Sequence, residues 1–136
     1  MIYVDTVAWI ALFDADTNSP LSEAARTYIE TIEEPLVTSD LVVAETHKWL
    51  VYHGKSQARA TAAIQSLIEQ SACKILDIET TDRQDAFIIH RRYSDQLLSL
   101  TTAMSVALMR RYQIAKVLSF NKHFLLFPDL IRVPSA

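Results

Sequence analysis

The apolar positions of the chain alternate between short continuous runs and helical spacings. Ile2 to Val4 is a buried-type run that Asp5 ends, and from Val7 the apolar residues follow the spacing of a helix. Further runs predict strands at residues 36–38, 74–78, 116–120 and 130–133. Helical spacing and capping residues predict helices between the turn at 17–20 and Pro35, over 41–53, from Ser56 through Ile68, over 80–93, and from Ser99 or Thr101 through Tyr112.

Strands that alternate with helices predict an α/β fold with a mostly parallel sheet and helices on both faces, as three layers. Five strands are expected, with the first in the centre because its run is wholly apolar. The strand at 130–133 is expected at an edge, before Pro134. The length of 136 residues predicts one domain over residues 1–136.

Composition narrows the classes of function. No apolar run approaches the roughly 20 residues that span a bilayer. Cys73 is the single cysteine, which excludes an intrachain disulfide and a cysteine-based zinc site. With no basic, cleavable leader at the start, we expect a cytoplasmic protein. The single glycine, Gly54, leaves no phosphate-binding glycine loop, so a small-molecule enzyme of flavodoxin shape is poorly supported.

The net charge of −3 conceals two unlike halves. Residues 1–81 carry 5 Lys or Arg and 12 Asp or Glu, whereas residues 82–136 carry 8 and 4. The pairs Arg91–Arg92 and Arg110–Arg111 belong to the basic half. The simple interpretation is solvated helix faces, and the functional one is a phosphate-attracting rim beside an acidic pocket.

Two acids stand where a site is expected. Asp5 follows the first strand, at the carboxyl edge where open α/β sheets place their sites, although a helix cap is an alternative role. Glu45 lies one turn into the helix after the second strand, beside the apolar stretch 41–44. A carboxylate on a buried-looking face needs a partner, a metal ion or a raised pKa.

Four segments together resemble the PIN domain, and within it the compact VapC-type toxin ribonucleases. They are Ile2-Tyr-Val-Asp-Thr6, the helix of Glu45, the run from Tyr93 to Ser105 with its Leu-Ser-Leu-Thr, and the Ser-Phe-Asn-Lys-His-Phe stretch ending at Phe124. The resemblance covers nearly the whole chain. It implies a PIN-like parallel sheet, with Asp5 and Glu45 binding Mg²⁺ or Mn²⁺ for hydrolysis of RNA phosphodiesters. It also implies a small antitoxin partner and a homodimer.

The sequence departs from the family pattern inside the expected site. Thr102 stands where the third acid would follow Leu-Ser-Leu-Thr, Asn121 replaces the fourth acid, and Val7 replaces a small polar residue. The attraction that is lost is about 4 kcal/mol per pair of unit charges 4 Å apart at an effective dielectric of 20. Asn121 still offers a carbonyl oxygen and Thr102 a hydroxyl, and Asp95 is the remaining candidate carboxylate.

Two functions follow from this pattern. The first is a metal-dependent endoribonuclease of toxin type that uses Asp5 and Glu45, with Asp95, Thr102 or Asn121. The alternative is a degenerate PIN-like protein that binds RNA or a protein partner without cleaving. The aromatic residues Trp9, Trp49 and Tyr52 are interpreted as core or dimer contacts, with base stacking as an undemonstrated role. The four histidines are interpreted as surface or structural residues, because they lack a zinc spacing.

Overall fold

The protein is described by a computed structural model that covers residues 1–13 and 19–135. The strands are β1 (Ile2–Val4), β2 (Leu36–Ser39), β3 (Lys74–Leu76), β4 (Lys116–Leu118) and β5 (Ile131–Val133). The helices are α1 (Thr6–Phe13), α2 (Pro20–Thr31), α3 (Asp40–Tyr52), α4 (Gln57–Ser71), α5 (Thr80–Arg92), α6 (Leu100–Arg111) and the 3₁₀ helix η1 (Lys122–Leu126). None of the described helices is long and apolar enough to cross a membrane. The predicted turn at Thr17 and Asn18 falls outside the described residues.

The five strands form one parallel sheet in the order β3-β2-β1-β4-β5. β1 is central, as predicted, and all three of its residues are buried. Tyr3 pairs with Val37 of β2 and with Val117 of β4, so the strands are in close register. Parallel register brings the residues that follow β1, β2 and β4 to one edge of the sheet.

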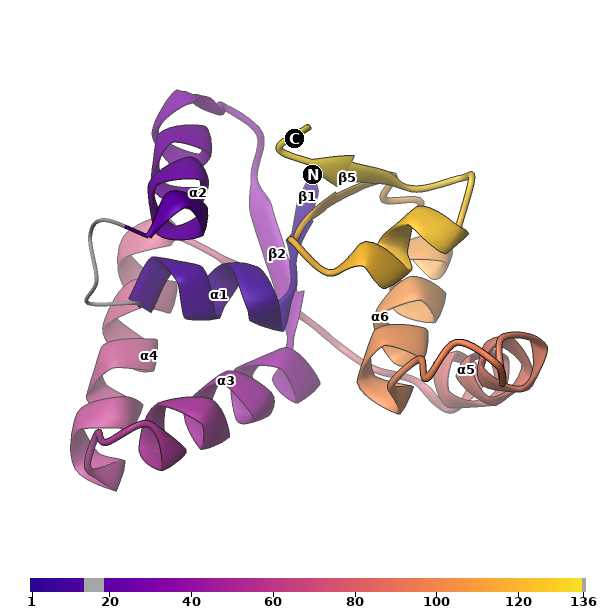
Figure 1. The fold of residues 1–136 in the computed structure, drawn as a ribbon, viewed down its shortest axis with the longest axis horizontal. Helices are drawn as coiled ribbons and strands as arrows, with labels where there is room; N and C mark the ends of the chain where they lie inside the picture. Colours follow the sequence, from indigo (N-terminus) through magenta and orange to yellow (C-terminus); the bar gives the residue numbers. More distant parts are fainter. Residues whose placement is uncertain (14–18, 136) are drawn as a thin grey trace.

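Helices cover both faces of this sheet (Figure 1). Helices α1 to α4 lie on one side, where α1 packs against both α2 and α3, and α3 packs against α4. Helices α5 and α6 pack closely against each other on the other side. The predicted three-layer α/β/α fold with a parallel five-stranded sheet is confirmed.

Short-range chemistry sets the helix ends. Ser39, Ser56 and Ser99 are N-caps whose hydroxyls accept hydrogen bonds from the first turns of α3, α4 and α6. Such caps satisfy backbone N–H groups that have no partner within the helix. Gly54 follows α3 with a φ of 101°, a conformation that side chains with a Cβ rarely adopt.

Two strands end earlier than the apolar pattern predicts. The pattern continues to residue 120, but β4 stops at Leu118, where its partner β1 also ends. Likewise β3 stops at Leu76 because β2 ends opposite it at Ser39. Ladder pairing, rather than apolar content, therefore sets these ends, and Ser119, the residue after β4, donates its hydroxyl to Asp5 while its N–H bonds to Val133 of β5.

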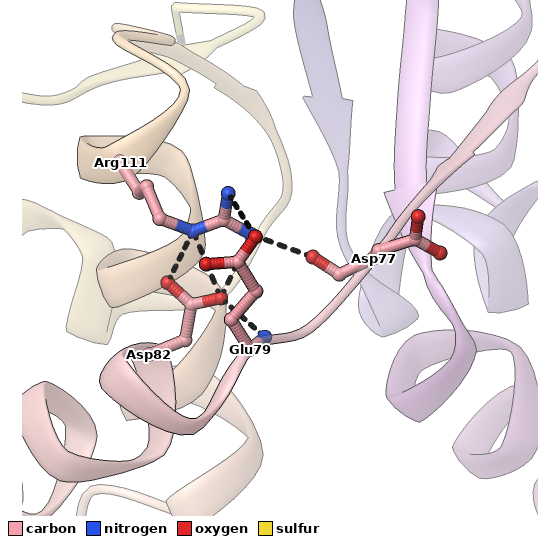
Figure 2. A network of polar contacts seen from close by, with 4 residues as sticks. All are labelled: Asp77, Glu79, Asp82 and Arg111. Carbon is pink, nitrogen blue, oxygen red and sulfur yellow. Dashed lines mark hydrogen bonds and ion pairs between the residues drawn. The ribbon is translucent and has the colours of Figure 1, made fainter.

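A polar network ties the start of α5 to the end of α6 (Figure 2). The Arg111 guanidinium donates to both carboxylate oxygens of Asp82 and to the backbone carbonyl of Asp77, and it pairs with Glu79 at 3.4 Å. Asp82 also accepts the Glu79 N–H at 2.8 Å, and its side chain is only 1% exposed. Burial alone would raise the pKa of Asp82, but the Arg111 and Glu79 bonds and the Arg111 charge outweigh it and lower the pKa.

Candidate functional site

Asp5 is a buried carboxylate at the junction of β1 and α1. Its backbone carbonyl accepts the N–H groups of Ala8 and Trp9 and so starts the helix. Its side chain accepts the Ser119 hydroxyl at 3.0 Å from the end of β4. Burial, with a smaller contribution from the Glu45 charge, raises the pKa of Asp5 to about 6, although the hydrogen bonds to the carboxylate act in the opposite direction. The helix start therefore uses the backbone carbonyl of Asp5 and leaves its carboxylate available for a site.

Glu45 is brought to the same edge by α3. The Thr6 hydroxyl, from the residue next to Asp5, donates to Oε1 of Glu45 at 2.9 Å. Glu45 is partly buried, whereas Asp5 is 3% exposed. The structure therefore brings together the two acids that the sequence singles out, and their like charges repel each other.

Tyr3, two residues before Asp5, joins three elements near this pair, whose charges both act on it. Its hydroxyl is hydrogen-bonded at 2.9 Å to Ser39, the N-cap of α3, and at 2.9 Å to Ser105 of α6. It thereby ties β1, which leads to Asp5, to the helix that carries Glu45. Desolvation of its buried hydroxyl raises the pKa of Tyr3 well above its usual range, so it serves as a neutral hydrogen-bonding group.

Thr102 lies on the same side of α6 as this tyrosine contact. It precedes Ser105 by nearly one helical turn, and Asp5 follows Tyr3 by two residues on one face of β1. Because α6 connects to the parallel strand β4, it runs against the strand direction, so Thr102 lies toward the carboxyl edge from Ser105. Its buried hydroxyl is hydrogen-bonded to Ser99 at 2.9 Å.

Asn121 reaches Asp5 through one intervening hydroxyl. Its backbone N–H donates to Ser119 at 3.0 Å, and Ser119 in turn donates to Asp5. Its side-chain carbonyl accepts the His123 N–H at 3.0 Å and caps η1. The Asn121 carbonyl oxygen therefore already has a backbone partner, and His123 takes part through its backbone.

Asp95 is placed apart from this arrangement. It is exposed in the turn between α5 and α6, and its carboxylate accepts a long bond of 3.4 Å from Gln96. No contact with Asp5 or Glu45 is found for it within the described part of the chain. Its assignment to the site stays a prediction from the sequence.

Three hydroxyl groups of the site are absent from the sequence-based prediction. They are the hydroxyl of Thr6, bonded to Glu45, that of Ser119, bonded to Asp5, and that of Tyr3, bonded to Ser39 and Ser105. The place of Ser119 in the site could have been predicted, because Ser119 follows a strand and the carboxyl ends of parallel strands lie at one edge of the sheet. The partners of Thr6 and Tyr3 depend on the orientation of α3 and α6, which periodicity does not give.

Two carboxylates are available here to bind a magnesium-type ion, whereas the family pattern implies four acids. Residues 1–13 and 19–135 contain no cluster of three or more His, Cys, Asp or Glu side chains suited to a metal. Mg²⁺ nevertheless binds through one or two carboxylates, keeping water and accepting substrate phosphate as further ligands. Asp5 and Glu45 could supply that minimum, and a cation between them would offset both the burial of the Asp5 charge, which is the main reason for its raised pKa, and the smaller repulsion from Glu45.

The two basic pairs of the second half are not an open phosphate-binding rim. Arg110 makes a bidentate pair with Asp129, with both bonds at 2.9 Å. Arg111 is held by Asp82. Arg91 and Arg92, at the end of α5, are exposed and form no ion pair within residues 1–13 and 19–135, and cations there favour the helix terminus.

Comparison with known proteins finds similar folds among solved structures and one matching family model. The toxin VapC20 of Mycobacterium tuberculosis, described as cleaving the sarcin-ricin loop, superposes with a TM-score of 0.81 at 23% identity, over 93% of this chain and 94% of that one. A toxin–antitoxin complex from Klebsiella pneumoniae superposes with a TM-score of 0.69 at 18% identity, over 96% of each chain. No curated protein matches the sequence significantly. The model of the PIN domain family matches residues 2–130, and the chain therefore belongs to the PIN domain family.

Proposed function

We propose that the protein is a divalent-metal-dependent endoribonuclease of toxin–antitoxin type. The observation that carries this proposal is the pair of Asp5 and Glu45, held together at the carboxyl edge of a PIN fold. The similarity to VapC20, a toxin that cleaves the sarcin-ricin loop, supports RNA as the substrate. An acid pair that is costly to keep charged and unpaired is typical of a functional site.

In this proposal Asp5 and Glu45 hold Mg²⁺ or Mn²⁺. The ion would stabilise charge on the phosphate and lower the pKa of an attacking water. Ser119 and Thr6 orient the two carboxylates through the bonds described above. Thr102 contributes a neutral hydroxyl at the edge, and the Asn121 oxygen keeps one lone pair beyond its bond to His123. We assign no role to Asp95.

The proposal extends to partners and location. The similarity to a chain of a toxin–antitoxin complex supports a small antitoxin protein as partner. A homodimer and a cytoplasmic location complete the proposal. The lone Cys73 supports a reducing compartment, because it is buried and has no second cysteine to pair with.

Glu45→Gln should abolish RNA cleavage while preserving the fold. The amide keeps an oxygen for the Thr6 hydroxyl but loses the charge that holds the ion. A metal contributes several kcal/mol to such a transition state, so the rate should fall about 100-fold or more. Cleavage of a mixed RNA pool with Mn²⁺ or Mg²⁺, and with EDTA, measures this.

Glu69→Gln is the matched control, because Glu69 is an exposed acid on α4. It should cleave at the wild-type rate. Equal cleavage by Glu45→Gln would assign the activity to other residues or to a contaminant. Absence of cleavage by the wild-type protein would favour an RNA-binding or partner-binding protein without a nuclease site.

Thr102→Asp combined with Asn121→Asp should strengthen Mn²⁺ binding by at least about tenfold. Each added carboxylate near Asp5 attracts the cation by about 4 kcal/mol per unit of cation charge at 4 Å and an effective dielectric of 20, less the mutual repulsion of the acids. Calorimetric titration of the free protein with Mn²⁺ measures the affinity directly. Thr101→Asp is the control, since Thr101 points about 100° away around α6. Unchanged affinity in the double variant would remove Thr102 and Asn121 from the site.

A further inference from the structure

One segment of the acidic half of the chain is locally basic. Between Glu45 and Glu69 the sequence contains no Asp or Glu. The same segment holds three of the five Lys and Arg residues of positions 1–81, namely Lys48, Lys55 and Arg59. All three are exposed, and none forms an ion pair with an acid in the described part of the chain. This surface is therefore free to neutralise phosphate groups.

Aromatic rings lie among these cations at the end of α3. Tyr52 is 77% exposed, and the ammonium of Lys48 lies 5.8 Å from the centre of its ring. Beside it, Trp49 and His53 stack with ring centres 4.0 Å apart. We call Lys48, Trp49, Tyr52 and His53 the Tyr52 platform. The interpretation of Tyr52 as a core residue is wrong, because most of its side chain faces solvent.

The Tyr52 platform is continuous with the acid pair. Glu45, Lys48 and Tyr52 are spaced i, i+3 and i+7, which places them along one face of α3. At 1.5 Å per residue, Tyr52 lies roughly 10 Å along the helix from Glu45. A chain bound at Glu45 can thus continue over Lys48 to Tyr52.

A nucleic-acid substrate needs such a surface in this protein. The overall charge is −3, and the acid pair itself repels phosphate. Arg110 and Arg111 of the basic half are engaged with Asp129 and Asp82. Lys48, three residues after Glu45 on the same face of α3, therefore offers a phosphate contact next to the acid pair.

We propose that the Tyr52 platform binds the single-stranded RNA that leads away from the acid pair. Tyr52 stacks with a base, and Lys48 contacts the adjoining phosphate, with Lys55 and Arg59 extending the basic surface. Aromatic faces beside cations are the chemistry of single-strand recognition without sequence preference. The inference rests on the proposed function for the identity of the ligand, but its test requires no cleavage.

The test uses the full chain carrying Glu45→Gln, in EDTA, with a fluorescein-labelled 12-nucleotide single-stranded RNA of mixed sequence. Fluorescence anisotropy gives the affinity at several salt concentrations. Adding Tyr52→Ala should weaken binding about tenfold, whereas Tyr52→Phe should retain it because the ring remains. Adding Lys48→Ala should reduce the slope of log affinity against log salt by about 0.7, the value for one phosphate contact on a single strand.

Phe87→Ala and Lys74→Ala are the matched controls, since both residues are exposed but lie outside the platform. Neither should change the affinity or the slope. Equal binding by Tyr52→Ala and Phe87→Ala would overturn the proposal, even if Glu45→Gln abolishes cleavage. Loss of a dimer in light scattering for Tyr52→Ala, without weaker RNA binding, would assign the platform to a second copy of the chain. If Tyr52→Ala weakens RNA binding but the wild-type protein cleaves no RNA, the Tyr52 platform is an RNA-binding surface and the proposal of nuclease activity is wrong.

Discussion

Arg111→Met should destabilise the protein by about 2–3 kcal/mol, because it leaves the buried Asp82 carboxylate without its cationic partner. Asp82 keeps the Glu79 N–H, and water can reach the network through Arg111, which is 27% exposed, so the largest costs known for buried ion pairs are not expected. The change also releases the Asp77 carbonyl and removes the polar link between α5 and α6 that Figure 2 shows. Urea unfolding at pH 7 measures the loss.

The pH dependence identifies the cause. Because the pKa of Asp82 is lowered in the folded protein, its contribution to stability is present above the unfolded-state pKa and is lost as pH falls through the folded value. The difference between wild type and Arg111→Met should therefore shrink in acid. A difference that stays constant down to pH 3 would assign the loss to packing of the arginine stem.

Arg110→Met is the matched control from the adjoining residue. Its partner Asp129 is 49% exposed, so this pair should contribute no more than about 1 kcal/mol. Adding Asp82→Asn to Arg111→Met should recover part of the stability, since the unpaired buried charge is then removed. An equal loss in the Arg110 and Arg111 variants would show that burial of Asp82 is irrelevant.

The sequence predicts this fold well because local signals agree with one another. The apolar run of β1 identifies the central strand, and the serines at 39, 56 and 99 are N-caps at or next to the predicted helix starts. The Arg111–Asp82 pair was not predictable, since it joins residues 29 positions apart whose meeting depends on how α5 packs on α6. Charge content favoured solvated helix faces there, with a phosphate-attracting rim as the functional alternative, whereas the structure pairs Arg111 with the buried Asp82.

The site was predictable to a smaller extent. Asp5 and Glu45 follow β1 and β2, neighbours in a parallel sheet, so topology alone brings them together. Asp95 has no such constraint, because it lies in a turn between helices. The hydrogen bonds of the Thr6, Ser119 and Tyr3 hydroxyls depend on side-chain orientation, which the sequence does not give. In the sequence, Tyr3 is indistinguishable from an ordinary apolar strand residue.

Asp5→Asn should stabilise the folded protein at neutral pH while abolishing cleavage. A carboxyl with a pKa of about 6 in the folded state and 3.8 as its usual value binds its proton more tightly when folded. Stability from Asp5 is therefore fully present below pH 3.8 and is lost as pH rises through about 6. The asparagine variant avoids this loss, so its advantage should be small at pH 4 and reach up to about 3 kcal/mol at pH 7.5.

A divalent cation should reverse that advantage. Because binding to the folded state alone stabilises it by mass action, Mn²⁺ should raise the melting temperature of the wild-type protein and leave Asp5→Asn unchanged. Asp85→Asn, at an exposed acid on α5, should show neither the pH-dependent gain nor a loss of the Mn²⁺ effect. Equal stability of wild type and Asp5→Asn at every pH would mean that the pKa of Asp5 is not raised in the folded protein. An Mn²⁺ effect retained in Asp5→Asn would place the ion elsewhere. If Asp5→Asn is more stable at neutral pH and also loses the Mn²⁺ effect, the charge of Asp5 lowers the stability of the free protein and binds the metal ion.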